Sequence, residues 1–561
     1  MKKLKITITT MGLLLVSSCS SNLDINPQGR LIEENIVRDE VWVNQQLISA
    51  YAVLDGHPSL FFAPASNWTL GDVASDDFYK GSSIGDQPPL NDIERYSPST
   101  TNIYLSSKWN SIYDGISKCN QTLLSAEAAI NLGASSDNIK ILTAEARFLR
   151  AHYHMEAKKI WNNIPFVSET TTEVPSNTVN AWPLIQEDLN YAILNLPNSQ
   201  NDKGRASLWT AKAYLAKAFM FQNNLEAAKP VLDDIINNGP YDLVLNYHDN
   251  FNAEKENNVE SVFAVQNSVN DGGQGLSNGN PGGRLNHPYT PLGDAPGDGC
   301  CGFFQPSQNL VNAFKTDAKG LPLLDTFNDE DVKSDQGISS DTPFSPYTGT
   351  LDPRLDWAVG RRDIEYLGWG PMPGKRWIRD QENGGPYVGK KHEYLKSQAG
   401  TLSASTNGAY SAVNTPLVRY SDILLWRAEI HAENNELNKA MLLVNRVRNR
   451  AANPDGFVKN EDGSPAANYL IKPYESFPDK EYAVKAVRFE RRLELASEGH
   501  RFFDLVRWGI AEQTLNNYIS IEATKRSYLA KAVFREINNY YPIPLEAINS
   551  SGNVLEQNSG Y

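Results

Sequence analysis

Apolar residues recur at helical spacing in paired segments of the chain. Between residues 205 and 238, small and apolar side chains mark one face of two successive helices, which an Asn-Asn step at 223–224 separates. Segment 416–451 repeats this plan, and further pairs are expected at 104–131 and 137–161. Helical hairpins of this kind bury their apolar faces by stacking on one another. The pattern predicts a mainly α fold with a tetratricopeptide-like scaffold of helical hairpins.

Two long stretches interrupt the helical pattern. Glycine, proline, asparagine and aromatic residues dominate residues 264–415, where helical spacing returns only near 306–316, and a second irregular stretch covers 56–98. Loops of this length inside a folded domain usually carry function. We therefore expect a single domain over residues 19–561, with these two loop-rich regions as the binding part. Its helical scaffold is expected at roughly 33–55, 104–262, 416–451 and 480–510.

A densely charged helix is expected near the C-terminal end. The sequence "VRFERRLELASEGHRFFDLVRWG" at 487–509 alternates arginines with carboxylates. Two of these carboxylates could form an acid/base pair, as in glycosidases. A buried ion network that holds the C-terminal helices together is the interpretation we favour.

Composition and charge narrow the class of ligand. The chain has 561 residues, a net charge of −14 and 10% aromatic residues. Binding to nucleic acid requires a basic face, and none stands out, so no nucleic-acid partner is expected. The aromatic content fits a protein that handles neutral, polar ligands.

The N-terminus has the pattern of an exported, lipid-anchored protein. Lys2, Lys3 and Lys5 precede a short apolar run that ends at "VSSC". The run is too short to span a bilayer, so we predict a lipoprotein signal peptide at residues 1–18. Cys19 would then carry the lipid (palmitate among its acyl chains), which anchors the mature protein to a membrane.

Motifs of catalysis and metal binding are incomplete. "GGPYVGKK" at 384–391 lacks the hydroxyl residue and the flanking elements of a phosphate loop, and "GSSIG" at 81–85 is followed by prolines instead of a helix. His152 and His154 would point away from each other on a helix. No cofactor or metal is expected. Structural calcium is conceivable from the Asp and Asn residues of the loops, but no calcium-binding loop motif supports it.

The cysteines raise a separate question. After lipidation of Cys19, the chain keeps Cys119, Cys300 and Cys301, and no CxxC pair exists. The Cα atoms of neighbouring residues lie ~3.8 Å apart, so a Cys300–Cys301 bond would close a strained ring. We propose this vicinal disulfide. The alternatives are a bond between one of the two and Cys119, or free thiols throughout.

Several segments along the chain carry a family signature. They are "RFERRLELASEGHRFFDLVRWG", "AEARFLRAHYHMEAKKIWNNIPFV", "DPRLD", "PLVRYSDILLWRAEIHAENN" and the ending "YYPIPLEAINSSGNVLEQNSGY". Together they resemble the SusD/RagB family of nutrient-binding lipoproteins from Bacteroidetes, which implies a lipid anchor in the outer membrane at the cell surface. The resemblance implies a SusD-like helical core with a loop-rich ligand site and no catalysis. It also implies capture of oligosaccharide or polysaccharide for polysaccharide utilisation and nutrient uptake, with delivery to a SusC-type TonB-dependent transporter. Alternatives are a peptide or other nutrient cargo, or a helical glycosidase or lyase.

Carbohydrate binding requires aromatic rings for the apolar sugar faces and planar polar groups for the hydroxyl pairs. Asp72 and Asp76, in "GDVASDD", are expected to be structural caps. A Cys300–Cys301 disulfide would offer a rigid apolar platform at the same site. The candidate glycan-binding residues are Asp55, Trp68, Asp77, Tyr79, Tyr96, Tyr289, Cys300, Cys301, Phe303, Trp369, Arg376, Trp377 and Tyr394.

Overall fold

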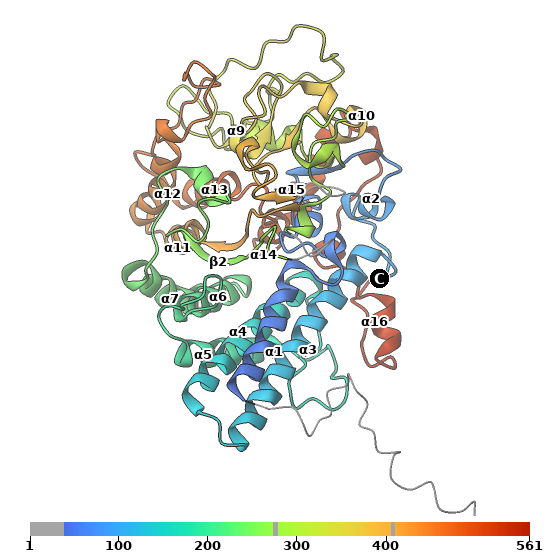
Figure 1. Ribbon diagram of the computed structural model, residues 1–561. Helices are drawn as coiled ribbons and strands as arrows, with labels where there is room; N and C mark the ends of the chain where they lie inside the picture. The colour runs from blue at the N-terminus through green and yellow to red at the C-terminus, as the bar shows by residue number, and fades with distance from the viewer. Residues whose placement is uncertain (1–38, 273–278, 405–409) are drawn as a thin grey trace, which may run out of the picture.

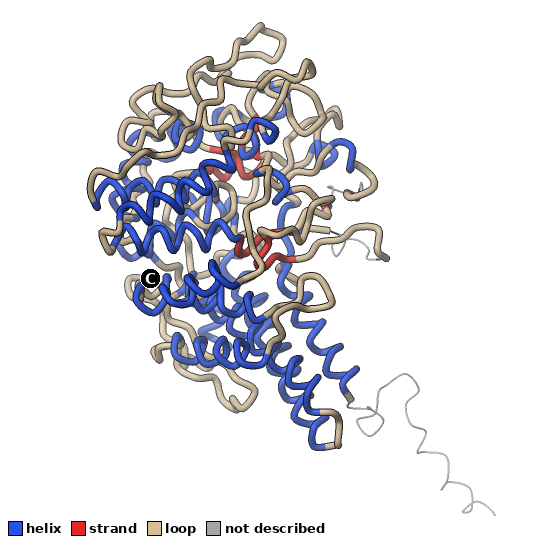
Figure 2. Tube along the Cα trace, turned by 90° about the vertical axis from the view of Figure 1, so that its left-hand side faces the viewer, coloured by secondary structure: helices blue, strands red, loops and turns tan. Residues whose placement is uncertain are grey.

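The computed structural model describes residues 39–272, 279–404 and 410–561 of the chain (Figure 1). The predicted signal peptide and Cys19 lie outside these residues. Helices predominate in the described part, which confirms the mainly α fold. Figure 2 shows the long helices gathered in the lower part of the molecule, and the loops crowded in the upper part.

The N-terminal half is a succession of antiparallel helices that stack on one another. Each of these helices contacts the next along the chain from α3 onward, and α1 lies against both α3 and α4. Asp39 and Asn102 cap the starts of α1 and α3 with their side chains. The helices are α1 (Glu40–Ala52), α3 (Ile103–Asn131), α4 (Ser136–Trp161), α5 (Trp182–Asn195), α6 (Leu208–Phe221) and α7 (Leu225–Asn238).

A second group of helices continues the stack in the C-terminal part. α7 contacts α11, and α11 in turn packs against α12 and α13. The group consists of α11 (Tyr420–Glu433), α12 (Leu437–Ala451) and α13 (Lys480–Glu494). The chain then continues through α14 (Arg501–Arg507), α15 (Ala511–Glu522), which contacts α14, and α16 (Leu545–Ser550), which lies apart from them (Figure 1).

The prediction of one helix over 487–509 is wrong, because the chain breaks between α13 and α14. Ser497 and Gly499 have φ angles of 71° and 72° in the left-handed region, and a Cβ on Gly499 would lie 1.9 Å from the carbonyl oxygen of Ser66. The Gly499 amide donates to the Asp72 carboxylate at 2.8 Å. This break lets the loop before β1 reach the helical core.

The charged helices form the buried ion network that their sequence predicts. Arg419 donates to Glu260, Glu494 and Glu498, all of which are buried. Arg354 bonds the same Glu494 at 3.0 Å. A buried carboxylate that accepts bonds from several arginines serves structure, because its charge is already neutralised.

The loop regions and their borders contain short strands and short helices, of which the sequence pattern predicts only the helix near 306–316, observed as α8. The strands form two-stranded antiparallel sheets, β1 with β3, β2 with β8, β4 with β5 and β6 with β7. The strands are β1 (Phe78–Gly81), β2 (Ser261–Val265), β3 (Phe303–Pro306), β4 (Val359–Gly360), β5 (Val388–Gly389), β6 (Ser403–Ala404), β7 (Tyr410–Ser411) and β8 (Thr415–Arg419). The short helices are α2 (Pro88–Glu94), α8 (Gln308–Ala313), α9 (Leu355–Ala358) and α10 (Gln381–Gly384).

Candidate functional site

The pairing of β1 with β3 brings the two loop-rich regions together. Gly81 lies opposite Phe303, at the point where β1 ends and the cysteine segment enters β3. The amide of Ser82 donates to the carbonyl oxygen of Gly302 at 2.5 Å, which extends this contact by one residue. The turn 82–87 and the loop 286–302 are therefore neighbours, although more than 200 residues separate them in the sequence.

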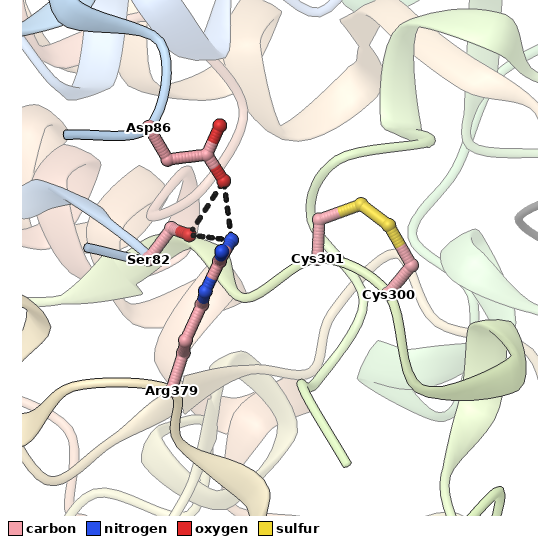
Figure 3. Close-up of a disulfide and its surroundings, with 5 residues drawn as sticks. All are labelled: Ser82, Asp86, Cys300, Cys301 and Arg379. Carbon is pink, nitrogen blue, oxygen red and sulfur yellow. Dashed lines mark hydrogen bonds and ion pairs between the residues drawn. A yellow bond between two sulfur atoms is a disulfide. The ribbon is translucent and has the colours of Figure 1, made fainter. Parts of the chain in front are cut away.

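A hydrogen-bonded cluster lies on the turn after β1. Arg379 donates to the Asp86 carboxylate at 2.5 Å and to the Ser82 hydroxyl at 3.1 Å, and that hydroxyl lies 3.0 Å from the same carboxylate oxygen (Figure 3). The side chains of Arg379 and Asp86 are 39% and 29% exposed. The pair thus presents guanidinium donors and a carboxylate acceptor side by side at the surface.

The Cys300–Cys301 disulfide lies beside this cluster. The structure joins the two sulfur atoms, and Figure 3 shows them next to Ser82, Asp86 and Arg379. Both cysteines are half-buried. Cys119, the proposed alternative partner, is a free thiol buried in α3.

Tyr289 provides an aromatic ring at the same place. The guanidinium of Arg379 lies 5.5 Å from the centre of the Tyr289 ring, a cation–π distance. Gly302 directly follows the disulfide in the sequence, and a Cβ built on Gly302 would lie 3.0 Å from the Cβ of Tyr289. Tyr289 therefore lies close to the disulfide. We call Asp86, Tyr289, the Cys300–Cys301 disulfide and Arg379, together with the buried Ser82 that supports Asp86 and Arg379, the disulfide face.

A second arginine–aspartate pair comes from the same loops. Arg376 donates to Asp294 at 2.9 Å, and their side chains are 48% and 35% exposed. Trp377 and Thr290 donate to the other carboxylate oxygen of Asp294. Arg376 therefore lies at the surface, as the sequence predicts for a ligand-binding residue.

Seven of the predicted glycan-binding side chains belong to the interior and not to a surface. The indole of Trp68 donates to the carbonyl oxygen of Gly282, the hydroxyl of Tyr79 donates to Glu522, and the Tyr394 hydroxyl accepts from the Gly297 amide. The polar atoms of these three side chains thus have hydrogen-bond partners inside the protein, and their rings fill the core beneath the loops. The seven buried residues are Trp68, Asp77, Tyr79, Tyr96, Phe303, Trp377 and Tyr394.

Asp77 is buried for an electrostatic reason. Its carboxylate bonds Arg492 at 2.6 Å, and the neighbouring Asp76 bonds Arg501 at 2.7 Å. Asp72 accepts from Gly499. The sequence "GDVASDD" therefore attaches the first loop region to α13 and α14, which agrees with the structural role expected for Asp72 and Asp76 and extends it to Asp77.

Asp55 and Trp369 contact other parts of the molecule. Asp55 is half-buried after α1 and lines a groove of about 600 Å³ with Tyr51, Arg205 and Gln266, none of which belongs to the disulfide face. Trp369 is half-buried, with the Lys396 ammonium 5.6 Å from its ring. Of the predicted residues, the structure thus groups Tyr289, Cys300 and Cys301 on the disulfide face.

The sequence analysis missed Ser82, Asp86 and Arg379. Ser82 and Asp86 lie in the predicted binding region 56–98, but Ser82 is considered only within the incomplete esterase motif at 81–85, and Asp86 directly follows that motif. Arg379 follows the predicted pair Arg376 and Trp377. The signal that could have found them is a cluster of polar residues directly beside tight glycine turns in both loop regions.

Buried charge lies directly beneath the disulfide face. Burial lowers the pKa of Lys80 to about 8, although Glu94 and Asp86 nearby act in the opposite direction. Burial also raises the pKa of Glu94, against hydrogen bonds from the Tyr528 hydroxyl and the Lys80 amide. Within the described ranges, no group of three or more His, Cys, Asp or Glu side chains is placed to hold a metal ion.

Comparison with known proteins assigns the family. The family model described as "SusD family" matches residues 259–561, more than half of the chain. A second model, described as "Starch-binding associating with outer membrane", matches residues 23–220. The chain belongs to the SusD family. This membership confirms the resemblance found in the sequence. It also confirms the expectation that the chain is not an enzyme, because the family consists of non-catalytic binding proteins.

Individual relatives cover nearly the whole SusD-family chain. A SusD-like protein from Bacteroides ovatus is 24% identical over 91% of this chain and 83% of its own, and one from Formosa agariphila is 24% identical over 97% of both. Among solved structures, a laminarin-binding SusD-like protein superposes with a TM-score of 0.67, at 24% identity, over 93% of this chain and 100% of its own. Surface glycan-binding protein A from Bacteroides thetaiotaomicron, in complex with laminarihexaose, superposes with a TM-score of 0.63, at 20% identity, over 92% and 99%.

The structure adds one observation on membrane association. Among the residues that it describes, no helix has the length and apolar character required to cross a bilayer. The second family description links this SusD-type domain with the outer membrane.

Proposed function

We propose that this protein is a cell-surface lipoprotein that captures oligosaccharide or polysaccharide and delivers it to a SusC-type TonB-dependent transporter. Lipidation at Cys19 would hold it at the outer membrane. The family assignment supports the role, and two structural neighbours, one laminarin-binding and one solved with laminarihexaose, support a carbohydrate as the ligand.

The observation that carries the proposal is the composition of the disulfide face. Tyr289 and the disulfide offer apolar surface for the C–H face of a sugar ring, while Asp86 and Arg379 offer an acceptor beside donors for a pair of adjacent hydroxyls. These groups come from segments that the fold holds rigidly together. A pre-formed arrangement of this kind loses little conformational entropy on binding.

Arg376 and Asp294 extend the proposed site. They sit on the loops that carry Arg379 and Tyr289, and both are partly exposed. We assign to them contacts with a further sugar unit. We assign Trp369 to the periphery of the proposed site, because its half-buried ring packs beside Lys396 and Tyr394.

The test is calorimetry of the soluble domain that begins after Cys19, with laminarin and a panel of other neutral polysaccharides. We expect binding without release of reducing ends, and at least tenfold weaker binding for Tyr289→Ala, since a stacked ring contributes about 1 kcal/mol or more beyond its buried area. Arg446→Ala is the control, because Arg446 forms an exposed pair with Asp242 outside the site. Release of sugar would refute the non-catalytic role, and binding of peptides alone would replace carbohydrate by the alternative cargo.

The oxidation state of the cysteines has its own test. Mass spectrometry of the exported protein after digestion should show Cys300 and Cys301 in one peptide, about 2 Da lighter than its dithiol form. Two alkylated thiols at these positions would remove the disulfide platform from the proposal.

A further inference from the structure

Lys80 is an enclosed lysine at the end of β1, directly behind the disulfide face. Its ammonium donates to the carbonyl oxygens of Ser83 at 2.8 Å and Asp86 at 2.7 Å. Its backbone amide donates to Glu94 at 3.1 Å, and its ammonium lies 5.8 Å from the centre of the Phe303 ring. The side chain has no exposed surface. A buried charge in this position must be compensated by the groups it bonds.

Those bonds fix the shape of the turn that carries Asp86. The turn begins at Ser82, whose amide is tied to Gly302, and Asn383 donates to the carbonyl oxygens of Gly81 and Ser82. Lys80 instead joins Ser83, near the start of the turn, to Asp86, near its end. Hydrogen bonds from an ionised donor are about twice as strong as neutral ones, so the charge on Lys80 contributes directly to this tie.

Each element that packs against Lys80 brings a charged group close to it. Glu94 comes from α2 and Arg95 directly follows it, Asp86 comes from the turn, and Arg379 comes from the loop before α10. Burial lowers the pKa of Lys80 to about 8, the two carboxylates raise it and the two arginines lower it. Lys80 is therefore protonated at neutral pH and loses its proton in the mildly alkaline range.

We propose that Lys80 is a positioning residue for the carbohydrate site: its buried ammonium holds the turn 82–87 so that the Asp86 carboxylate meets Arg379. Removal of the Lys80 amino group takes away both bonds to the turn, which loosens it and separates the pair. The importance of this for sugar binding rests on the proposed function, but the positioning itself is a property of the free protein and is tested without a sugar.

The experiment is hydrogen–deuterium exchange of the soluble domain, read by mass spectrometry on peptides that cover residues 81–87. At pH 7, Lys80→Met should raise exchange of the turn amides about tenfold, a change of the size expected when a charge-assisted bond is lost. Burial lowers the pKa of Lys80 to about 8, so opening of the turn takes up a proton above that pH. In the unmodified domain, protection corrected for the intrinsic exchange rate should therefore rise as the pH is raised above 8, whereas in Lys80→Met it should stay constant with pH.

The matched control is Lys108→Met. Lys108 is also buried, its pKa is also lowered to about 8 by burial, and its ammonium donates to the carbonyl oxygen of Pro64 in another part of the molecule. This variant should leave exchange of residues 81–87 unchanged. Equal protection of the turn in Lys80→Met and the unmodified domain, or a flat pH profile in the latter, would overturn the proposal. If Lys80→Met fails to fold, the pH profile of the unmodified domain and of Lys108→Met decides the matter.

Calorimetry with laminarihexaose at pH 7 separates this inference from the proposed function. Loosening of the turn together with weaker binding supports both. Loosening in a protein that binds no carbohydrate of the panel would leave the positioning role in place and refute the proposed function alone.

Discussion

Replacement of Glu494 by glutamine tests the buried ion network most directly. Glu494 has no exposed surface, and its carboxylate accepts bonds from Arg354 at 3.0 Å, Arg419 at 2.9 Å and Arg450. Glutamine preserves the volume but removes the negative charge, which leaves the three guanidinium groups undercompensated. Removal of one partner from a buried ion pair costs about 3–5 kcal/mol, so we expect the free energy of unfolding to fall by about that amount.

The assay is urea denaturation at pH 7, followed by tryptophan fluorescence and by circular dichroism. Asp242→Asn is the control, because Asp242 forms an exposed pair with Arg446 at the surface, where ion pairs contribute little. A loss of less than 1 kcal/mol in Glu494→Gln, equal to the control, would refute the claim that the network holds the C-terminal helices together.

The same variant makes a prediction about pH. Burial alone would raise the pKa of Glu494, but Arg450, Arg419 and Arg354 outweigh it and hold that pKa well below the usual value. A depressed carboxyl pKa stabilises the fold above the pKa of the unfolded chain, and this contribution is lost as the pH falls towards the folded value. The difference in stability between the unmodified protein and Glu494→Gln should therefore shrink below about pH 4.

Two further predictions concern stability. Burial lowers the pKa of Lys108 and Lys217 to about 8. Because the unfolded chain then binds more protons than the folded one between pH 8 and about 10.5, the melting temperature should rise as the pH is raised from 8 to 9.5. A fall over this range would contradict the assigned burial. Gly499→Ala should lower the melting temperature by several degrees, because its Cβ would lie 1.9 Å from a backbone oxygen. Gly509→Ala should lower it much less, because Gly509 has a similar φ of 68° but open space around it. Equal losses in the two variants would contradict the role of Gly499.

The long helices could be predicted because their signal is local. In α6 and α7, apolar residues at helical spacing and an Asn-Asn step are enough to define the hairpin, and α11 and α12 repeat them. The break between α13 and α14 could not be predicted, because its cause is the backbone of Ser66, more than 400 residues away in the sequence. A close approach between distant segments leaves no mark on local periodicity.

The exposed part of the site could not be separated from its interior by sequence. Trp68 and Trp377 lie in irregular segments rich in glycine and proline, the usual setting of surface residues, yet both are buried because these loops form layers that pack on one another. The antiparallel pairing of β1 with β3, which precedes the turn that places Asp86 at the surface beside the buried Ser82, joins residues more than 200 positions apart. By contrast, the adjacency of Cys300 and Cys301 is a property of the sequence itself.

Positive and negative charges are balanced around the disulfide face, although the protein is acidic overall. The chain carries a net charge of −14, but Arg376 and Arg379 each face an aspartate, so the proposed site has no large excess of either sign. Such pairs hold their side chains in fixed positions and leave further donors and acceptors for hydroxyl groups. A neutral oligosaccharide fits this arrangement better than a strongly anionic one.

The central claim is that the disulfide face binds the carbohydrate, and the most direct measurement is calorimetry with Arg379→Ala, using the polysaccharide to which the unmodified domain binds best. Loss of hydrogen bonds from a charged group costs about 1.5–3 kcal/mol, so affinity should fall at least tenfold with no large change in melting temperature. Unchanged affinity in a folded Arg379→Ala protein would contradict the claim and place the ligand elsewhere on the molecule.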